Sequence, residues 1–264
     1  MTSPLILSDA QQVIGRRWSE GQSPEQARIL SLARDALDFI SATGQWYPFE
    51  DFRKVAGERQ AQAIGEDGST GLRELMSQTD GFFGKLLSDP KAVGEQVPIQ
   101  LILDTLRFIS STRQHDAFGD FLEHVESHAP PFVLASFETK EEAEAWLKNH
   151  PAPPAFADIL IGGRYHDVVY ERETDFRRLP WNRHLERYLA WLKQVEPPVA
   201  AAEFATREEA EAWLRSQPNP ARRAWVTIAG EFYLAAYHRN INHRALYPLS
   251  MAEGYEEETE GLGD

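Results

Sequence analysis

The sequence of 264 residues contains no cysteine. Disulfide bonds, thiolate metal sites and a cysteine nucleophile are therefore excluded. No apolar run approaches the roughly 18 residues that a membrane-spanning helix needs. The N-terminal segment also lacks the basic residues and the long apolar run of a signal peptide. We therefore expect a cytoplasmic protein that makes no contact with membranes.

Positive charge is also scarce. The chain has 27 Lys and Arg residues against 41 Asp and Glu residues, which gives a formal net charge of −14. Phosphate backbones and anionic lipids repel such a chain, so we expect no nucleic-acid partner. A protein partner with a basic surface would be attracted instead.

Common catalytic motifs are missing as well. The sequence has no phosphate-binding glycine loop, no G-x-S-x-G and no H-E-x-x-H, and Gly162-Gly163-Arg164 is typical of a hairpin turn. We therefore assign no catalytic residue, no cofactor and no metal ligand from the sequence. The absence of these motifs removes the common enzyme classes but not every enzyme.

A long internal repeat dominates the second half of the chain. The segment 137–147 reads FETKEEAEAWL and returns 67 residues later, at 204–214, as FATREEAEAWL. Flanking Pro-Pro breaks, apolar strands and glycine turns keep the same offset, so each copy predicts a leading helix followed by a βαββ unit. We expect copies at 128–179 and 195–246 that together form one mostly antiparallel sheet of about six strands.

A fainter repeat, offset by 69 residues, marks two helical corners in the first half. Leu37–Phe52 matches Leu106–Phe121, and apolar residues at three- and four-residue steps indicate helices with one buried face. The predicted fold is therefore α+β, with an N-terminal helical layer before the duplicated units. The predicted domains are a helical domain at 1–127, a duplicated domain at 128–250 and an acidic disordered tail at 251–264.

Helix capping and core packing account for the residues of the repeated helix. Thr139 with Glu142, and Thr206 with Glu209, match the capping-box pattern, which accounts for the glutamate runs without catalysis. Trp146 and Trp213 share a helical stripe with Ala and Leu, so we expect them in the core.

Several polar residues remain as candidates for binding. His238 and His243 belong to the densest polar cluster, but the first copy lacks both, and a loop with solvated side chains is an alternative. Arg172 and Arg239 recur in both copies. They predict either pairing with the glutamate-rich helix of their own copy or contact with an anion or acidic peptide.

Positions at which the copies differ are candidates for specificity. Asp158 aligns with Trp225, and His166-Asp167 align with Tyr233-Leu234. Trp and Tyr are enriched among interface anchors, so Trp225, Tyr233 and Leu234 are predicted binding residues. The alternative is that the N-terminal helices cover this face of the sheet.

The duplicated units, with their glycine-turn hairpins and the ending His-Arg-Asn-Ile-Asn-His-Arg at 238–244, resemble a paralogous family of myxobacterial proteins. That resemblance covers about residues 121–250 and part of the helical half, and it implies no established activity. The repeated helix also resembles one helix of the hybrid-binding domain of ribonuclease H and viroplasmin. The basic residues that face nucleic acid there are missing here.

Three functions follow from these observations. The first is a non-catalytic protein-binding role, most concretely an inhibitor or immunity-type protein that neutralises a toxin or enzyme. The second is an enzyme with a cleft between the helical half and the sheet. The third is a scaffold subunit, a homo-oligomer in which an edge of the sheet pairs with a second copy.

Overall fold

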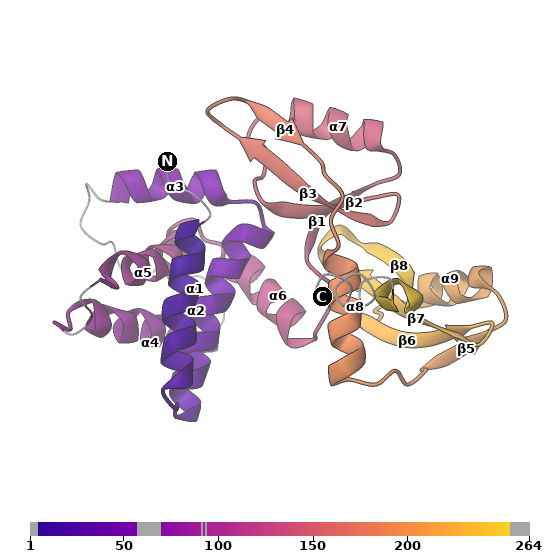
Figure 1. The fold of residues 1–264 in the computed structure, drawn as a ribbon, viewed down its shortest axis with the longest axis horizontal. Coiled ribbons are helices and arrows are strands. Elements are labelled where there is room, and N and C mark those ends of the chain that lie inside the picture. The colour runs from indigo at the N-terminus through magenta and orange to yellow at the C-terminus, as the bar shows by residue number, and fades with distance from the viewer. Residues whose placement is uncertain (1–4, 57–69, 91, 93, 254–264) are drawn as a thin grey trace, which may run out of the picture. The chain divides into compact units, whose positions relative to one another are not determined.

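The computed structural model describes residues 5–56, 70–90, 92 and 94–253. The chain divides into two compact units, 1–123 and 124–264, called here the helical unit and the repeat unit. Among the described residues, the named elements of the first are all helices, and the second combines helices with strands, which confirms the predicted α+β class (Figure 1). The disordered tail is predicted at 251–264. Residues 251–253 are helical instead, and Ala252 is buried in the core, while residues 254–264 lie outside the described residues.

The helical unit begins with α1 and reaches α6, whose last turn belongs to the repeat unit. Ser23 starts the second helix with the capping box that its sequence predicts: its hydroxyl accepts from the amide of Gln26, and the Gln26 side chain accepts from the amide of Ser23. The helices are α1 Leu5–Ser19, α2 Pro24–Ala42, α3 Trp46–Ala56, α4 Thr70–Leu87, α5 Gln96–Ser111 and α6 His115–Glu126.

The two corners of the 69-residue repeat pack on each other through reciprocal aromatic contacts. Phe39 lies 5.3 Å from Phe118, and Phe108 lies 5.6 Å from Phe49, between ring centroids. These are equivalent pairs with the copies exchanged, since Phe39 matches Phe108 and Phe49 matches Phe118. Each corner therefore completes its core with rings from the other.

A hydrogen-bonded pair lies at the same junction. The Gln45 amide donates to Gln114 Oε1 at 2.7 Å, and the Gln114 amide donates to Gln45 Oε1 at 2.8 Å. Each glutamine also donates to the threonine two residues before it, Thr43 or Thr112, at 2.7 Å. The two corners are thus related by an approximate twofold arrangement.

The repeat unit contains two copies of one motif, joined by helix α8 His184–Val195. The first copy comprises β1 Val133–Phe137, α7 Lys140–Asn149, β2 Ala157–Ile161, β3 Arg164–Glu171 and β4 Phe176–Arg178. The second comprises β5 Ala202–Phe204, α9 Arg207–Ser216, β6 Arg223–Ile228, β7 Glu231–His238, the 3₁₀ turn η1 Arg239–Ile241 and β8 His243–Pro248.

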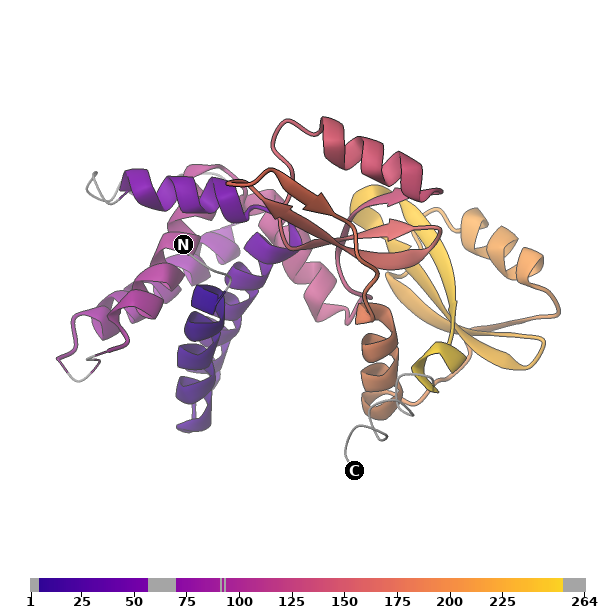
Figure 2. The same ribbon diagram turned by 45° about the horizontal axis from the view of Figure 1, so that its top comes forward.

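Each copy forms its own four-stranded sheet, ordered β1-β2-β3-β4 and β5-β6-β7-β8 (Figure 2). The first two strands of each are parallel and the other pairings are antiparallel. The expected single sheet of about six strands is therefore wrong. The segment after each hairpin adds a fourth strand, β4 or β8, and this strand completes the sheet within its own copy.

Local sequence signals fix the same geometry twice. The capping boxes predicted at Thr139 and Thr206 are both present, with each threonine accepting from the amide three residues on. Tight turns follow β2 and β6. Gly163 and Gly230 have φ of 76° and 86°, in the left-handed region that glycine adopts without strain.

One face of each sheet packs against the helix of its own copy. The buried residues under α7 and α9 match one another at all six positions, with the offset of 67. Trp146 and Trp213, expected in the core, are half-buried at its edge, 5.3 and 5.5 Å from Phe137 and Phe204. The two sets are Ala143, Leu147, Ile159, Ile161, Val168, Leu179 and Ala210, Leu214, Val226, Ile228, Ala235, Leu246.

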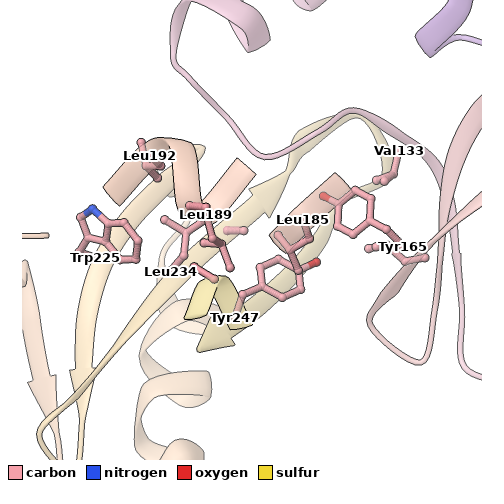
Figure 3. Close-up of a cluster of buried hydrophobic side chains, with 12 residues drawn as sticks. Val133, Tyr165, Leu185, Leu189, Leu192, Trp225, Leu234 and Tyr247 are labelled. Atoms are coloured by element: carbon pink, nitrogen blue, oxygen red, sulfur yellow. The ribbon is translucent and has the colours of Figure 1, made fainter. Parts of the chain in front are cut away.

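The opposite face of the second sheet packs against α8. Leu185, Leu189 and Leu192 of this helix lie among buried residues of the second sheet (Figure 3). Val133 and Tyr165 of the first copy join the same cluster. A single core therefore links the two copies through α8.

Candidate functional site

The predicted binding residues Trp225 and Leu234 belong to this core. Trp225 is 4% exposed and Leu234 is 0% exposed, both beneath α8 (Figure 3). Neither is placed to anchor a partner on the surface, so the structure contradicts this prediction for both residues. A helix does cover this face, but the expected N-terminal helices are not the ones that do so. The covering helix is α8, which the sequence placed only as the leading helix of the second copy. Tyr233 is half-buried and packs on the opposite face, beside the core under α9.

The predicted histidine cluster is also largely internal. His238 is 0% exposed, because it faces Tyr165 and Tyr247 between the two copies, and burial lowers its pKa to about 3. It cannot bind a partner on the surface. Between the two histidines, the Asn240 amide donates to the carbonyl of Val133 at 2.7 Å. This segment, for which a solvated edge strand and loop was the alternative, therefore joins the copies.

The remaining predicted residues lie nearer the surface. His243 is half-buried and lines a groove formed by residues of both copies, and burial lowers its pKa. Arg172 is half-buried in the turn after β3, and Arg239 is exposed in η1. Neither arginine lines the groove that contains His243, so the three residues remain separate candidates.

Two other repeated arginines have a defined structural role. Arg177 donates to the carbonyls of Leu147 and Lys148, at 2.6 and 2.7 Å, at the end of α7. Its counterpart Arg244 donates to the carbonyl of Gln217, after α9, at 3.4 Å. Both cations lie where the helix dipole is negative, so each holds the last strand of its copy against its helix.

A polar cluster that the sequence did not predict lies on the first copy. Asp158 of β2, Asp167 of β3 and His184 at the start of α8 offer one ligand atom each, all within 4.8 Å of one another. Nδ1 of His184 lies 2.9 Å from Oδ2 of Asp158. Asn182 is buried beside them, and its amide donates to Oδ1 of Asp158 and of Asp167, at 2.8 and 2.9 Å. We call these four residues the Asp–His cluster.

The charges in this cluster are coupled. Hydrogen bonding to Asp158 raises the pKa of His184 against the opposing effect of burial. Burial raises the pKa of the Asp167 carboxyl, and the nearby charge of Asp158 adds to this shift. The arrangement therefore favours a positive charge between the two carboxylates.

The second copy replaces the whole cluster with apolar side chains. Asp158 and Asp167 correspond to Trp225 and Leu234, while Asn182 and His184 correspond to Leu249 and Met251. Trp225 and Leu234 are buried in the core under α8, and Leu249 and Met251 are partly buried and pack against it. These four positions lie together in the fold, and all four are polar in the first copy and apolar in the second.

The sequence contains a signal for one part of this cluster, the pairing of Asp158 with Asp167. A two-residue turn at Gly162-Gly163 sets the hairpin register, which places Asp158 directly opposite Asp167. The contribution of His184 depends on how the chain returns after β4, and no local pattern gives that path.

A groove lies between α7 and β4 of the first copy, with a volume of about 550 Å³. Its basic lining residues outnumber the acidic one, Glu144. Trp181 stands at one side with 47% of its surface exposed, and the Arg183 guanidinium lies 5.1 Å from its ring centroid. The basic lining residues are Lys140, Lys148, Arg177 and Arg178.

A second groove, with a volume of about 940 Å³, lies beside α9 and β8 and is also lined by Glu138 and by the Gly162–Arg164 turn of the first copy. Three basic positions are kept, since Lys140, Lys148 and Arg177 correspond to Arg207, Arg215 and Arg244. The aromatic position is not kept, because Pro248 stands where the first copy has Trp181. The two grooves thus share their charge and differ in their exposed aromatic residue.

Comparisons with protein-family profiles, with curated proteins and with solved structures found no match to this chain. Within the described residues, no helix is both long enough and apolar enough to cross a membrane.

Proposed function

We propose that the protein is a non-catalytic protein-binding protein that receives an acidic segment of its partner in the α7–β4 groove. Within this class we propose an inhibitor or immunity-type protein, which neutralises a toxin or enzyme by occupying its surface. The observation that carries the proposal is the groove itself: four basic side chains and one exposed tryptophan gathered on an otherwise acidic chain.

The chemistry of the groove suits a peptide with both charge and an apolar anchor. Trp and Arg are the residue types most enriched among binding hot spots. Trp181 offers a large apolar face, and the stacked Arg183 keeps a positive charge beside it. Carboxylates on either side of an apolar residue would meet the basic residues of α7 and β4.

The groove is also pre-organised. Arg177 is fixed by α7 carbonyls and by Asp175, which accepts from its guanidinium at 2.8 Å. A side chain that is already ordered loses little conformational freedom when a ligand binds, so more of the contact energy appears as affinity. Retention of the basic positions in the α9–β8 groove supports the same use of charge in both copies.

Long-range electrostatic attraction acts while the partner approaches, and short-range interactions in the groove act once the two surfaces are in contact. The net charge of −14 favours a partner with a positive overall field and speeds its approach. The groove contacts act only within about 8–10 Å at physiological salt, where screening leaves local charges dominant. We therefore propose a basic partner that presents a local acidic segment.

Selection from a displayed library of random short peptides tests the groove. We expect binders enriched in Asp and Glu around an apolar residue, with binding at least tenfold weaker to Trp181→Ala and to Arg178→Glu. Trp191→Ala is the matched control, because Trp191 is 41% exposed in the same unit but does not line the groove. Equal selection on the parent protein and on both groove variants would contradict the proposal.

The inhibitor role needs a second measurement. Proteins that the parent protein captures from native lysate, and that Trp181→Ala does not capture, would be purified. Their activity would then be measured in the presence and in the absence of the parent protein. We expect stoichiometric loss of the partner's activity, and an association rate that falls as salt increases. Binding without any loss of activity would remove the inhibitor role and leave the binding role.

A further inference from the structure

We propose that Asp158, Asp167 and His184 form a binding site for a divalent transition-metal ion of the Zn²⁺ type. The proposal is independent of the groove, because none of the three residues lines it. Two strands and one helix supply the ligands, so the ion would tie the start of α8 to the β2–β3 hairpin.

The geometry is close to that of a bound ion. Zn²⁺ binds nitrogen and oxygen at roughly 2.0–2.2 Å, which places neighbouring ligand atoms about 3.3 Å apart in a tetrahedron. The three ligand atoms already lie within 4.8 Å of one another. Small rotations of the side chains would therefore suffice, and the His184–Asp158 hydrogen bond would give way to two bonds to the ion.

The donor set is chemically suited to this ion. One imidazole nitrogen and two carboxylate oxygens are ligands that Zn²⁺ accepts readily. Asn182 donates to Oδ1 of both carboxylates and so fixes their orientation, leaving the second oxygen of each for the ion. Such outer hydrogen bonds are characteristic of protein metal sites, since they hold the ligands in place before the ion arrives.

The second copy shows that the fold does not require polar residues here. Trp225 and Leu234 occupy the equivalent positions as buried core residues, and Met251, in place of His184, is partly buried and packs against that core. In the first copy, two carboxylates face each other directly in the hairpin register. Their mutual repulsion destabilises the sheet unless a positive charge lies between them, and a divalent ion supplies more of that charge than His184 alone.

Three protein ligands leave at least one coordination position open. Structural zinc sites are usually closed by four protein ligands, whereas sites with three keep a position for water or a small anionic ligand. His184 is about one-third exposed, so solvent can reach this position. We therefore assign the open position to water in the protein alone.

Titration of chelator-treated protein with ZnCl₂, followed by calorimetry, tests the site. We expect one Zn²⁺ per chain and a rise in melting temperature, with affinity at least tenfold lower in His184→Ala and in Asp167→Asn. Glu186→Gln is the matched control, because it removes a carboxylate from the first turn of the same helix but not from the cluster. Its affinity should equal that of the parent protein.

The parent protein also provides a test that does not depend on variants. Co²⁺ in place of Zn²⁺ should give visible absorption bands typical of a low-symmetry site, and these should disappear when Zn²⁺ is added. Failure of the parent protein to bind either ion, or equal affinity in Asp167→Asn that retains its circular dichroism spectrum, would overturn the proposal. If both ligand variants unfold, the Co²⁺ spectrum of the parent decides.

Discussion

Asp158 and Trp225 occupy the same position in two copies of one fold, and only Trp225 is part of a core. Asp158 lies half-buried in a polar cluster, where it meets Asn182 and His184. Trp225 lies beneath Leu189 and Leu192 of α8 (Figure 3). The equivalent strand position thus contributes to core packing in the second copy and to a polar cluster in the first.

Trp225→Ala should destabilise the protein by about 3–5 kcal/mol, the range for emptying a buried aromatic site. The 4% exposure of the side chain is the reason, because the lost contacts cannot be replaced by water. Urea denaturation measures the change in the free energy of unfolding. Trp191→Ala, at a side chain 41% exposed, is the control and should cost about 1 kcal/mol or less. Equal costs for the two variants would contradict the assignment of Trp225 to the core.

Thr139→Ala and Thr206→Ala should each cost about 1 kcal/mol, the usual value for loss of an N-cap side chain. Both threonines accept from the amide three residues on, at 3.2 and 3.3 Å, so the two costs should agree within about 0.5 kcal/mol. The double variant should show their sum, because the two caps share no partner. A cost in one copy alone would show that the two helices are not equivalent in stability.

Gln45→Ala and Gln114→Ala should each cost about 1 kcal/mol, because each removes both hydrogen bonds between the two amides and leaves the other amide with only its threonine partner. The double variant should cost less than the sum by about 0.5 kcal/mol or more, since the second substitution removes a side chain that has already lost its bonds across the junction. A double-mutant cycle in urea measures this coupling. Strict additivity would show that the pair contributes nothing as a pair.

Acid should destabilise the repeat unit through His238. Burial lowers the pKa of this imidazole from 6.5 to about 3, so above pH 6.5 it is neutral in both the folded and unfolded states. As the pH falls below 6.5, the unfolded chain takes up a proton that the folded chain refuses. The resulting loss of stability is on the order of 2 kcal/mol between pH 7 and pH 5.

His238→Leu should remove this part of the pH dependence, measured as the free energy of unfolding at several pH values. Tyr247→Phe is the control. It removes the hydroxyl 3.4 Å from the imidazole but keeps the buried histidine, so its slope with pH should match that of the parent protein. The same slope in His238→Leu would show that other groups cause the acid sensitivity.

The repeat made much of this fold predictable. Matching residues 67 apart identified Ala143 with Ala210 and Leu147 with Leu214, and these pairs are equivalent in the two cores. The capping boxes at Thr139 and Thr206 were equally readable, because they depend on residues three apart. Signals that are local in the chain therefore carried over directly to the structure.

Features set by distant contacts were not predictable in this way. The strand Phe176–Arg178 is only three residues long, and it pairs with the edge of β3 opposite β2. The burial of Trp225 depends on which face α8 covers, and the alternation of residues along a strand does not determine that. The place of His184 beside Asp158 depends on the same helix.

The reciprocal packing of Phe39 on Phe118 and of Phe108 on Phe49 has a consequence for the origin of the helical unit. A single corner that carries both residues is self-complementary: two identical copies would satisfy each other across a twofold axis, as subunits of a homodimer do. The helical unit has the form of such a dimer joined end to end. Covalent linkage then replaces protein concentration with the effective concentration of a tether, so the pairing of the corners no longer depends on how much protein is present.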